Sequence, residues 1–170
     1  MVEYNIEVDK KDKIIGTRPR TDFYTGNYIH RASALILFNS KNEILIQKRV
    51  PTKKWHPNCY TYSVSGTVAE NETYESCLKK ETKEEIGIST PVKFLFKAFH
   101  SEATDKLFYS VYVGKSDDEI KFEEKEITKI KWIQVEELKK DIETNPQKYT
   151  PTFVEGMKIF FEKYYYTLKI

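Results

Sequence analysis

Residues 66–88 read GTVAENETYESCLKKETKEEIGI, and this segment is the most informative part of the chain. At about 100° per residue on a helical wheel, Glu81, Glu84 and Glu85 fall on the same side as the apolar residues of the segment. The lysines fall on the opposite side. The three carboxylates therefore continue the buried stripe of a helix predicted over residues 73–86, instead of forming an exposed acidic face.

Carboxylates turned inward at positions i, i+3 and i+4 of a helix repel one another and lose their hydration. Both effects are unfavourable unless a nearby cation offsets them. Mg²⁺ or Mn²⁺ suits such a site, because both ions prefer carboxylate oxygens and share their remaining coordination positions with substrate phosphates. An isolated E-x-x-E-E on a helix is more often surface charge. The inward position of these glutamates favours the metal site instead.

The spacing of the segment resembles the Nudix box. The segment reads G-x5-E-x7-K-E-T-x-E-E-x-G-I, and the box reads G-x5-E-x7-R-E-U-x-E-E-x-G-U, in which U is a bulky aliphatic residue. The positions that match are Gly66, Glu72, Glu81, Glu84, Glu85, Gly87 and Ile88. Lys80 replaces the usual arginine and keeps its charge without the planar guanidinium, and Thr82 stands at an aliphatic position.

Resemblance to Nudix hydrolases implies an α/β (α+β) fold, an α/β/α sandwich with a mixed central sheet, formed by one domain over residues 1–170. It also implies hydrolysis of a diphosphate that is bonded to another group, with water as the attacking group and Mg²⁺ or Mn²⁺ as the cofactor.

The resemblance also implies a role for each matching position. Glu84 and Glu85 would be the principal metal ligands, and Glu81 would be a further ligand or the base for the attacking water. The backbone carbonyl of Ser65 would complete the metal shell. The structural positions of the box are Gly66, Glu72, Lys80 and Gly87. Pairing of Glu72 with Lys80 would brace the loop before the helix.

Basic and acidic side chains outside the box are expected to complete the site. Lys48 and Arg49, at the end of a predicted strand, are candidates for binding the phosphates, and Arg31 is the alternative. The family usually adds one acid from a distal strand or loop. The candidates for that acid are Glu102, Asp105, Glu123, Glu124 and Glu126.

The resemblance extends beyond the box. From about Val8 to the end, the sequence is similar to the Nudix branch that includes isopentenyl diphosphate isomerase. In that isomerase a cysteine precedes the box glycine and a metal-binding histidine follows it, whereas this chain has Ser65 and Thr67 there. A serine hydroxyl is far less acidic than the thiol it replaces. His30 matches the position of one metal ligand of the isomerase. A single histidine in a strand, however, is more often a hydrogen-bonded structural residue.

Hydrolysis of a nucleoside diphosphate linked to another moiety is therefore the leading hypothesis. The alternatives are an isomerase of the kind just described and a non-catalytic module that binds a nucleotide. The loop at residues 52–62 carries Trp55, Tyr60 and Tyr62, which would either stack on a base or pack within the fold.

Composition limits the other classes of function. The chain has 28 Lys+Arg and 26 Asp+Glu, a formal net charge of +2, which argues against a nucleic-acid partner. No apolar run is long enough to span a membrane and no signal peptide is visible, so a cytoplasmic protein is expected. Cys59 and Cys77 are too few for a disulfide framework. The partner expected is a small diphosphate.

Periodicity and turn residues predict the remaining elements. Strands are expected at residues 3–8, 28–38, 43–50, 60–65, 92–100, 106–113 and 127–134, with 28–38 and 43–50 forming a hairpin. A second helix is expected at residues 151–166, where aromatic residues recur at helical spacing. This aromatic stripe would cover the core or dock a second copy of the chain as a homodimer.

Overall fold

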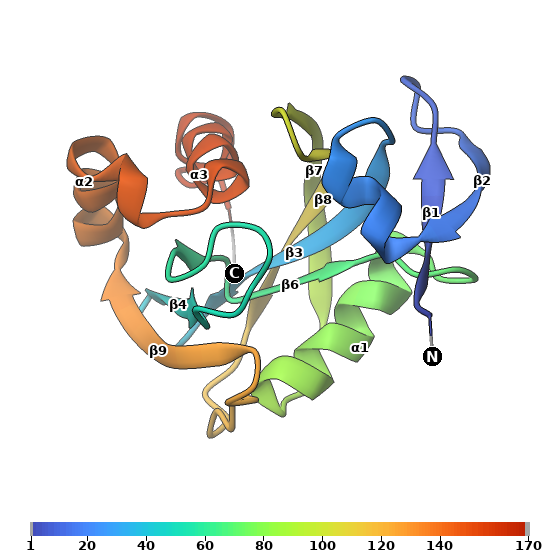
Figure 1. Cartoon of the computed structure of the whole chain (residues 1–170). Helices are drawn as coiled ribbons and strands as arrows, with labels where there is room; N and C mark the ends of the chain where they lie inside the picture. Colours follow the sequence, from blue (N-terminus) through green and yellow to red (C-terminus); the bar gives the residue numbers. More distant parts are fainter. Residues whose placement is uncertain (1, 169–170) are drawn as a thin grey trace.

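The apolar run at residues 34–38 forms the middle of strand β3 (His30–Phe38), which lies inside the sheet of a computed structural model describing residues 2–168 (Figure 1). Leu35 and Leu37 face one side of the sheet, and Ala34 and Ile36 face the other. A strand that is covered on both faces reads as a continuous apolar run, as β3 does.

The main sheet is mixed. Strand β8 (Lys106–Lys115) runs parallel to β3, and β7 (Val92–Ser101) pairs antiparallel with β8. On the other side of β3, strand β6 (Val64–Thr67) pairs antiparallel with residues 32–35. One parallel pair among antiparallel pairs is the mixed arrangement that the resemblance implies.

Strand β4 (Glu43–Arg49) follows β3 through the turn at residues 39–42 but pairs with it only at Phe38 and Ile44. Beyond that pair, β4 bonds instead to β5 (Tyr60–Thr61) and β9 (Ile127–Gln134). The predicted hairpin is therefore confirmed only near its turn. Because β3 and β4 have different neighbours, the sheet opens between them.

Helices cover both faces of the sheet, as Figure 1 shows. Helix α1 (Tyr74–Ile86) lies on the face of Leu35 and Leu37 and packs Leu78 against them. Helices α2 (Val135–Thr144) and α3 (Pro151–Lys163) lie on the other face. The α/β/α sandwich with a mixed sheet is confirmed.

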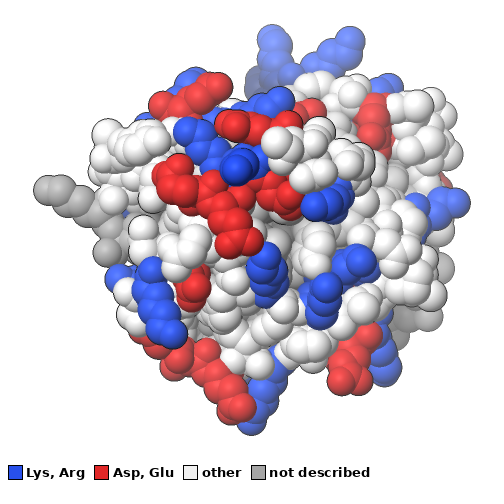
Figure 2. Space-filling view, turned by 90° about the vertical axis from the view of Figure 1, so that its left-hand side faces the viewer, with Lys and Arg blue, Asp and Glu red and all other residues white. Residues whose placement is uncertain are grey.

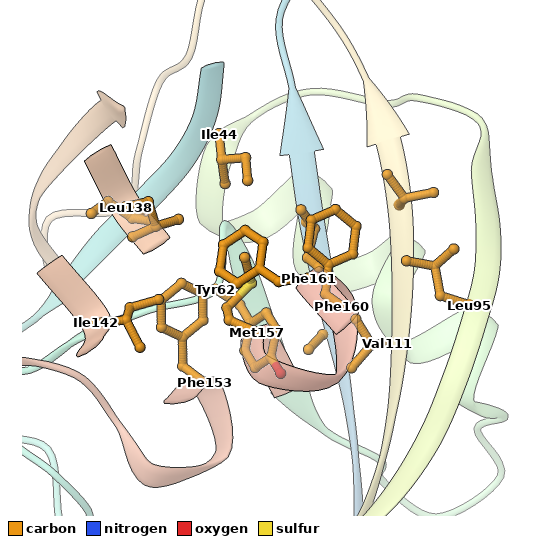
Figure 3. Packing of buried hydrophobic residues seen from close by; sticks show 14 of the residues in the cluster. Ile44, Tyr62, Leu95, Val111, Leu138, Ile142, Phe153, Met157, Phe160 and Phe161 are labelled. Carbon is orange, nitrogen blue, oxygen red and sulfur yellow. The ribbon is translucent and has the colours of Figure 1, made fainter. Parts of the chain in front are cut away.

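The larger core lies under α2 and α3. Phe153, Met157 and Phe160 of α3 are fully buried there, in contact with residues from the sheet (Figure 3). The aromatic stripe predicted at residues 151–166 therefore packs within this chain. The homodimer that would use the same stripe stays a prediction without support from this helix face.

The N-terminal residues form a separate two-stranded sheet of β1 (Tyr4–Val8) and β2 (Ile14–Pro19), followed by the short 3-10 helix η1 (Arg20–Thr25). Asp12, in the turn between the strands, accepts hydrogen bonds from Arg31 and from the Tyr74 hydroxyl and pairs with Lys97. These contacts attach the hairpin to the main sheet and to α1.

Two predictions about elements need correction. Residues 60–65 do not form one strand: β5 and β6 are separate, and Ser63 between them donates its hydroxyl to the Leu45 carbonyl. Helix α2 was not predicted, although Val135, Leu138 and Ile142 are buried at the spacing of a helix face. A second 3-10 helix, η2 (Pro146–Lys148), joins α2 to α3.

Among residues 2–168, no helix has both the length and the apolar character needed to cross a membrane. On the face shown in Figure 2, acidic and basic side chains lie interspersed. That face therefore presents no continuous area of one charge of the kind that binds a nucleic-acid backbone.

Candidate active site

A cavity of about 870 Å³ occupies the opening between β3 and β4. Its walls come from β3, the end of β4, β5 and β6, helix α1, and the loops at residues 52–56 and 123–126. Glu81, Glu84 and Glu85 line it together with Ser65 and Gly66. The fold thus brings the predicted metal ligands to one cavity.

Local sequence signals position these glutamates on α1. The helix begins after Thr73, whose side chain accepts a hydrogen bond from the Ser76 backbone, while the Ser76 hydroxyl accepts one from the Thr73 backbone. It ends at Gly87, which has a φ of 74°. Between these ends, the helix carries its last turns past the open part of the sheet.

Glu85 is the most buried of the three acids, with 8% of its surface exposed. Its Oε2 accepts hydrogen bonds from Gln47 Nε2 at 2.9 Å and from the Ser65 backbone at 3.3 Å. Burial raises the pKa of Glu85 to about 7, and the two hydrogen bonds compensate only in part. No cation of residues 2–168 is bonded to this buried carboxylate, which is therefore suited to receive one.

Glu81 lies against the backbone of Gly66. A Cβ at residue 66 would be 2.3 Å from Glu81 Cγ, so a glycine is required for this close approach. Burial raises the pKa of Glu81, and Lys80 Nζ, 3.3 Å from Glu81 Oε1, opposes that rise. Glu84 is exposed at the rim of the cavity, so the prediction that all three acids turn inward is too simple.

Glu72 and Lys80 form the pair expected from the box. Lys80 Nζ lies 2.8 Å from Glu72 Oε1, and Glu72 Oε2 accepts a hydrogen bond from the Ala69 backbone at 3.0 Å. Burial tends to raise the pKa of Glu72, but the bonds from Lys80 and Ala69 outweigh burial and lower it. This contact joins α1 to the loop that precedes it.

The lysines and arginines that line the same cavity, among the described residues, are Arg20, Arg49, Lys53, Lys54, Lys80 and Lys125. Burial lowers the pKa of Arg49 and that of Lys53, and the positive charge of Arg20 contributes to both shifts. Arg20 donates to Glu3 at 3.0 Å and Lys53 pairs with Glu126, while no carboxylate bonds to Arg49 within residues 2–168. Cations that are crowded together and partly desolvated favour the binding of a polyanion.

The structure does not bring the other two predicted cations to the cavity. Arg31 donates to Asp12 and is used to hold the N-terminal hairpin. Lys48 points elsewhere, 5.7 Å from the centre of the Tyr60 ring. Arg20 and Lys53 were not predicted, because no sequence pattern relates η1 or the loop after β4 to the box.

The five candidates for the distal acid differ in whether they line the cavity. Asp105, Glu123 and Glu126 line the cavity, and Glu102 and Glu124 are not among its lining residues. Asp105 is bound to His30 at 2.7 Å, and Glu126 pairs with Lys53. Glu123 carries neither contact, and its backbone donates to the Glu85 carbonyl at 2.9 Å.

Comparison with known proteins places this geometry in a family. The model of the NUDIX domain matches residues 28–153. The chain belongs to the Nudix hydrolase family. It is 46% identical over 161 residues to a prenyl-diphosphate phosphatase of Methanosarcina mazei, covering 92% of this chain and 94% of that protein. It is 29% identical to an isopentenyl-diphosphate Delta-isomerase of Photorhabdus laumondii, covering 90% and 89%.

Solved structures agree with this assignment. A crystal structure from Deinococcus radiodurans matches the hydrolase with a TM-score of 0.78 and 27% identity, covering 92% of this chain and 98% of that one. A MutT protein from Methanosarcina mazei matches with a TM-score of 0.69 and 17% identity, over 79% of this chain and 94% of that one. The second likeness concerns the fold alone.

The donor set of the hydrolase fits a divalent metal. Three carboxylates and a backbone carbonyl are hard oxygen ligands, and the buried Glu85 has no bonded cation among the described residues. Over residues 2–168, no three His, Cys, Asp or Glu side chains converge as a ready-made metal cluster. Glu81 Oε1 lies 3.3 Å from Lys80 Nζ, and Glu85 Oε2 accepts a hydrogen bond from Gln47 Nε2 at 2.9 Å, so each of these two carboxylates has a partner of its own.

The cavity of the hydrolase also has an apolar part. Ala32, Ala34 and Leu107 line it from the sheet, and Tyr62 and Tyr109 add aromatic surface. Tyr62 is buried and donates its hydroxyl to the Thr152 carbonyl. Of the three aromatics predicted to stack on a base or pack, Trp55 and Tyr62 line the cavity and Tyr60 does not.

The positions that separate this hydrolase from the isomerases lie in the cavity as well. Ser65 and Thr67 both line it. Cys59 and Cys77 do not, and Cys77 is buried with its Sγ 3.6 Å from the Thr67 carbonyl oxygen. His30 and Asp105 also line the cavity, and they are hydrogen-bonded to each other at 2.7 Å.

Proposed function

We propose that this Nudix hydrolase cleaves a small organic diphosphate with an apolar tail, in a reaction that requires Mg²⁺ or Mn²⁺. The observation that carries the proposal is a single cavity with two unlike parts: carboxylates and cations at one, and small apolar and aromatic side chains at the other. The 46% identity to a prenyl-diphosphate phosphatase supports the same substrate class.

The charged part provides for both the metal and the diphosphate. Glu81, Glu84, Glu85 and the Ser65 carbonyl would hold the metal ion. When bound, that ion would neutralise diphosphate charge and make water more acidic. Arg49, with no bonded carboxylate among the described residues, would bind the phosphate oxygens.

Glu81 is the best placed residue to accept the proton of the attacking water. Burial favours its protonated form, while Lys80 Nζ at 3.3 Å favours the carboxylate. These opposing effects suit a group that must take up a proton and release it again.

We also propose Glu123 as the distal acid. It lines the cavity, it carries no bonded cation in the described structure, and its backbone is hydrogen-bonded to that of Glu85. This backbone hydrogen bond joins the end of α1 to the loop that carries Glu123.

The apolar part would receive the tail. Ala32 and Ala34 lie on one face of β3, and Tyr109 of β8, which pairs with Ala32, lines the cavity beside them. An alkyl chain along these residues would be removed from water at about 0.8 kcal/mol per CH₂ group. A nucleoside diphosphate derivative is the second candidate, because Trp55 at the cavity offers an aromatic face.

The test is a substrate panel with products identified. Purified protein is incubated with Mg²⁺ and either dimethylallyl, geranyl and farnesyl diphosphates or nucleoside diphosphate derivatives, and the phosphorus species are followed by NMR. Faster release of phosphate from the prenyl compounds is expected. Folded protein that leaves every compound intact would indicate a binding module, and interconversion of double-bond isomers would indicate an isomerase.

Glu84→Gln tests the assignment of the metal ligands. The amide keeps the size of the side chain and removes a charged metal ligand, so activity should fall by about 100-fold or more. Mg²⁺ titration at fixed substrate concentration measures whether the remaining activity needs more metal. A normal rate in this variant would show that the metal ligands are assigned incorrectly.

We further propose that the protein acts in the cytoplasm on a small molecule and has no nucleic-acid partner. The balanced charge of the sequence and the interspersed charges in Figure 2 support the part of this proposal that concerns nucleic acid.

A further inference from the structure

The loop between β4 and β5 forms a strap over the cavity, defined here as residues 50–59. Its residues 52–56 all line the cavity. His56 and Asn58 have φ angles of 46° and 62°, in the left-handed region that non-glycine residues seldom adopt. The strap therefore keeps this shape only while contacts to the rest of the protein hold it.

Backbone bonds hold the ends of the strap, from Val50 to the Glu126 carbonyl and from Arg49 to the Cys59 carbonyl, whereas its middle is held by side chains. Trp55 Nε1 donates to the Thr104 carbonyl at 3.2 Å, and His56 Nε2 lies 2.9 Å from Glu102 Oε1. Within residues 2–168, no backbone-to-backbone hydrogen bond joins the strap to residues 102–105. The attachment of the strap to the β7–β8 turn thus depends on Trp55 and His56.

Trp55 is also held by ring contacts. Its indole stacks on His30 with ring centroids 5.5 Å apart and planes at 10°, and Tyr24 meets it edge-on at 4.4 Å. His30 is itself fixed by its hydrogen bond to Asp105 at 2.7 Å. The indole is therefore located by contacts from three different parts of the chain.

The backbone carbonyl of Trp55 holds Arg49. Both Arg49 Nε and Arg49 Nη2 donate to this one oxygen, at 3.2 Å and 2.9 Å. Two donors on a single acceptor define the plane of the guanidinium, and no hydrogen bond of the described chain uses Nη1. The orientation of Arg49 in the cavity is thus set by the position of Trp55.

We propose that Trp55 is a positioning residue for diphosphate binding, which acts by holding its own carbonyl where that oxygen orients Arg49. The inference rests on the proposed function, because Arg49 is given the diphosphate there. The indole clamp on His30 and Thr104 closes the strap, and the closed strap aims the guanidinium at the phosphates.

A double-mutant cycle tests this coupling. Trp55→Ala, Arg49→Lys and the double variant are compared with wild type for binding of methylenediphosphonate, a non-hydrolysable diphosphate, in the presence of Mg²⁺ by calorimetry. Each single variant should weaken binding by about tenfold, and the double variant should lose little more than either one. Trp55→Phe keeps the ring and loses the Nε1 donor, so it should weaken binding less than Trp55→Ala.

Kinetics and fluorescence give independent measurements. With a prenyl diphosphate that the wild type hydrolyses, the Trp55 variants should raise KM more than they lower kcat. Trp132→Phe is the matched control, since Trp132 lies on β9 and does not line the cavity. The chain has two tryptophans, so this control leaves Trp55 as the single indole, whose emission should change on binding of the diphosphonate.

The outcomes separate the inference from the proposed function. Wild type that neither binds the diphosphonate nor hydrolyses any diphosphate would overturn both. Wild type that binds it, with losses that multiply in the double variant, would overturn only the positioning role. Unchanged binding in both folded Trp55 variants would do the same.

Discussion

Glu85 and Glu84 are neighbours in the chain with opposite surroundings. Glu85 is buried and bonded to Gln47, whereas Glu84 is exposed at the rim of the cavity. A divalent ion between them would join a buried carboxylate to a hydrated one. Glu81, drawn toward Lys80, has an intermediate environment. Three chemically identical side chains thus differ because their positions on α1 differ.

The distal acid can be tested with a matched pair of neighbours. Glu123→Gln should lower activity by about 10- to 100-fold, because an acid of the cavity is lost. Glu124→Gln removes the same charge from a residue that does not line the cavity, and it should act near the wild-type rate. Initial rates at saturating Mg²⁺ measure both. Equal losses in the two variants would point to net charge, not to a site residue.

Helix α3 shows how closely the elements around the cavity are packed. Gly156 lies against the Tyr62 hydroxyl, and a Cβ at residue 156 would be 1.8 Å from that oxygen. Tyr62 is buried, with its ring at 4.9 Å from that of Phe153 at 89°. The tyrosine therefore cannot move aside, and α3 approaches the cavity wall as closely as a glycine allows.

Gly156→Ala should therefore destabilise the protein although alanine favours helices. Overpacking against Tyr62 costs about 1–3 kcal/mol, which exceeds the gain of about 1 kcal/mol in helix propensity. Urea unfolding measures the difference. Tyr62→Phe removes the clashing oxygen, so the double variant should recover part of the lost stability, with Tyr62→Phe alone as its control. Stability above wild type in Gly156→Ala would contradict this packing.

Metal binding at Glu85, as proposed, would be linked to folding. Its folded pKa, raised to about 7 by burial, exceeds the value of an unfolded glutamate, so the folded state holds the proton more tightly. The stability that this provides is complete at low pH and is lost as the pH rises through 7 in metal-free protein. The loss is on the order of 3 kcal/mol. Above pH 7 the buried carboxylate is ionised, and its negative charge would be available to a metal ion.

The stabilisation by Mg²⁺ should therefore grow with pH. The rise in unfolding temperature on adding Mg²⁺ should be small at pH 5.5 and larger at pH 8, because the metal competes with the proton for Glu85. Thermal unfolding with and without Mg²⁺ at the two pH values tests this. In Glu85→Gln, most of the pH dependence of the Mg²⁺ effect should disappear. A Mg²⁺ effect that falls with pH in wild type would contradict the assignment.

Much of the site could be predicted from residues 66–88, because the signals there are local. Capping by Thr73, the stop at Gly87 and the spacing of the glutamates all act within one helix and its flanking loops. The same segment implied the family and thereby the sandwich fold. The interior strand β3 was also predicted, since burial on both faces leaves a continuous apolar run.

Arg49 was predicted, and Lys80 as part of the box, but the other cations of the cavity were not, and the sequence could not choose among the five candidate acids, because both depend on contacts between distant segments. Arg20 reaches the cavity from η1 and Lys53 from the loop after β4, and no periodic pattern relates either segment to α1. Arg31 instead donates a hydrogen bond to Asp12. The cavity lies where β3 and β4 separate, because beyond the pair of Phe38 and Ile44 each strand is hydrogen-bonded to other strands. Strand pairing over long sequence separations is a property of the whole packed molecule, whereas helix ends and helix faces are properties of a short segment.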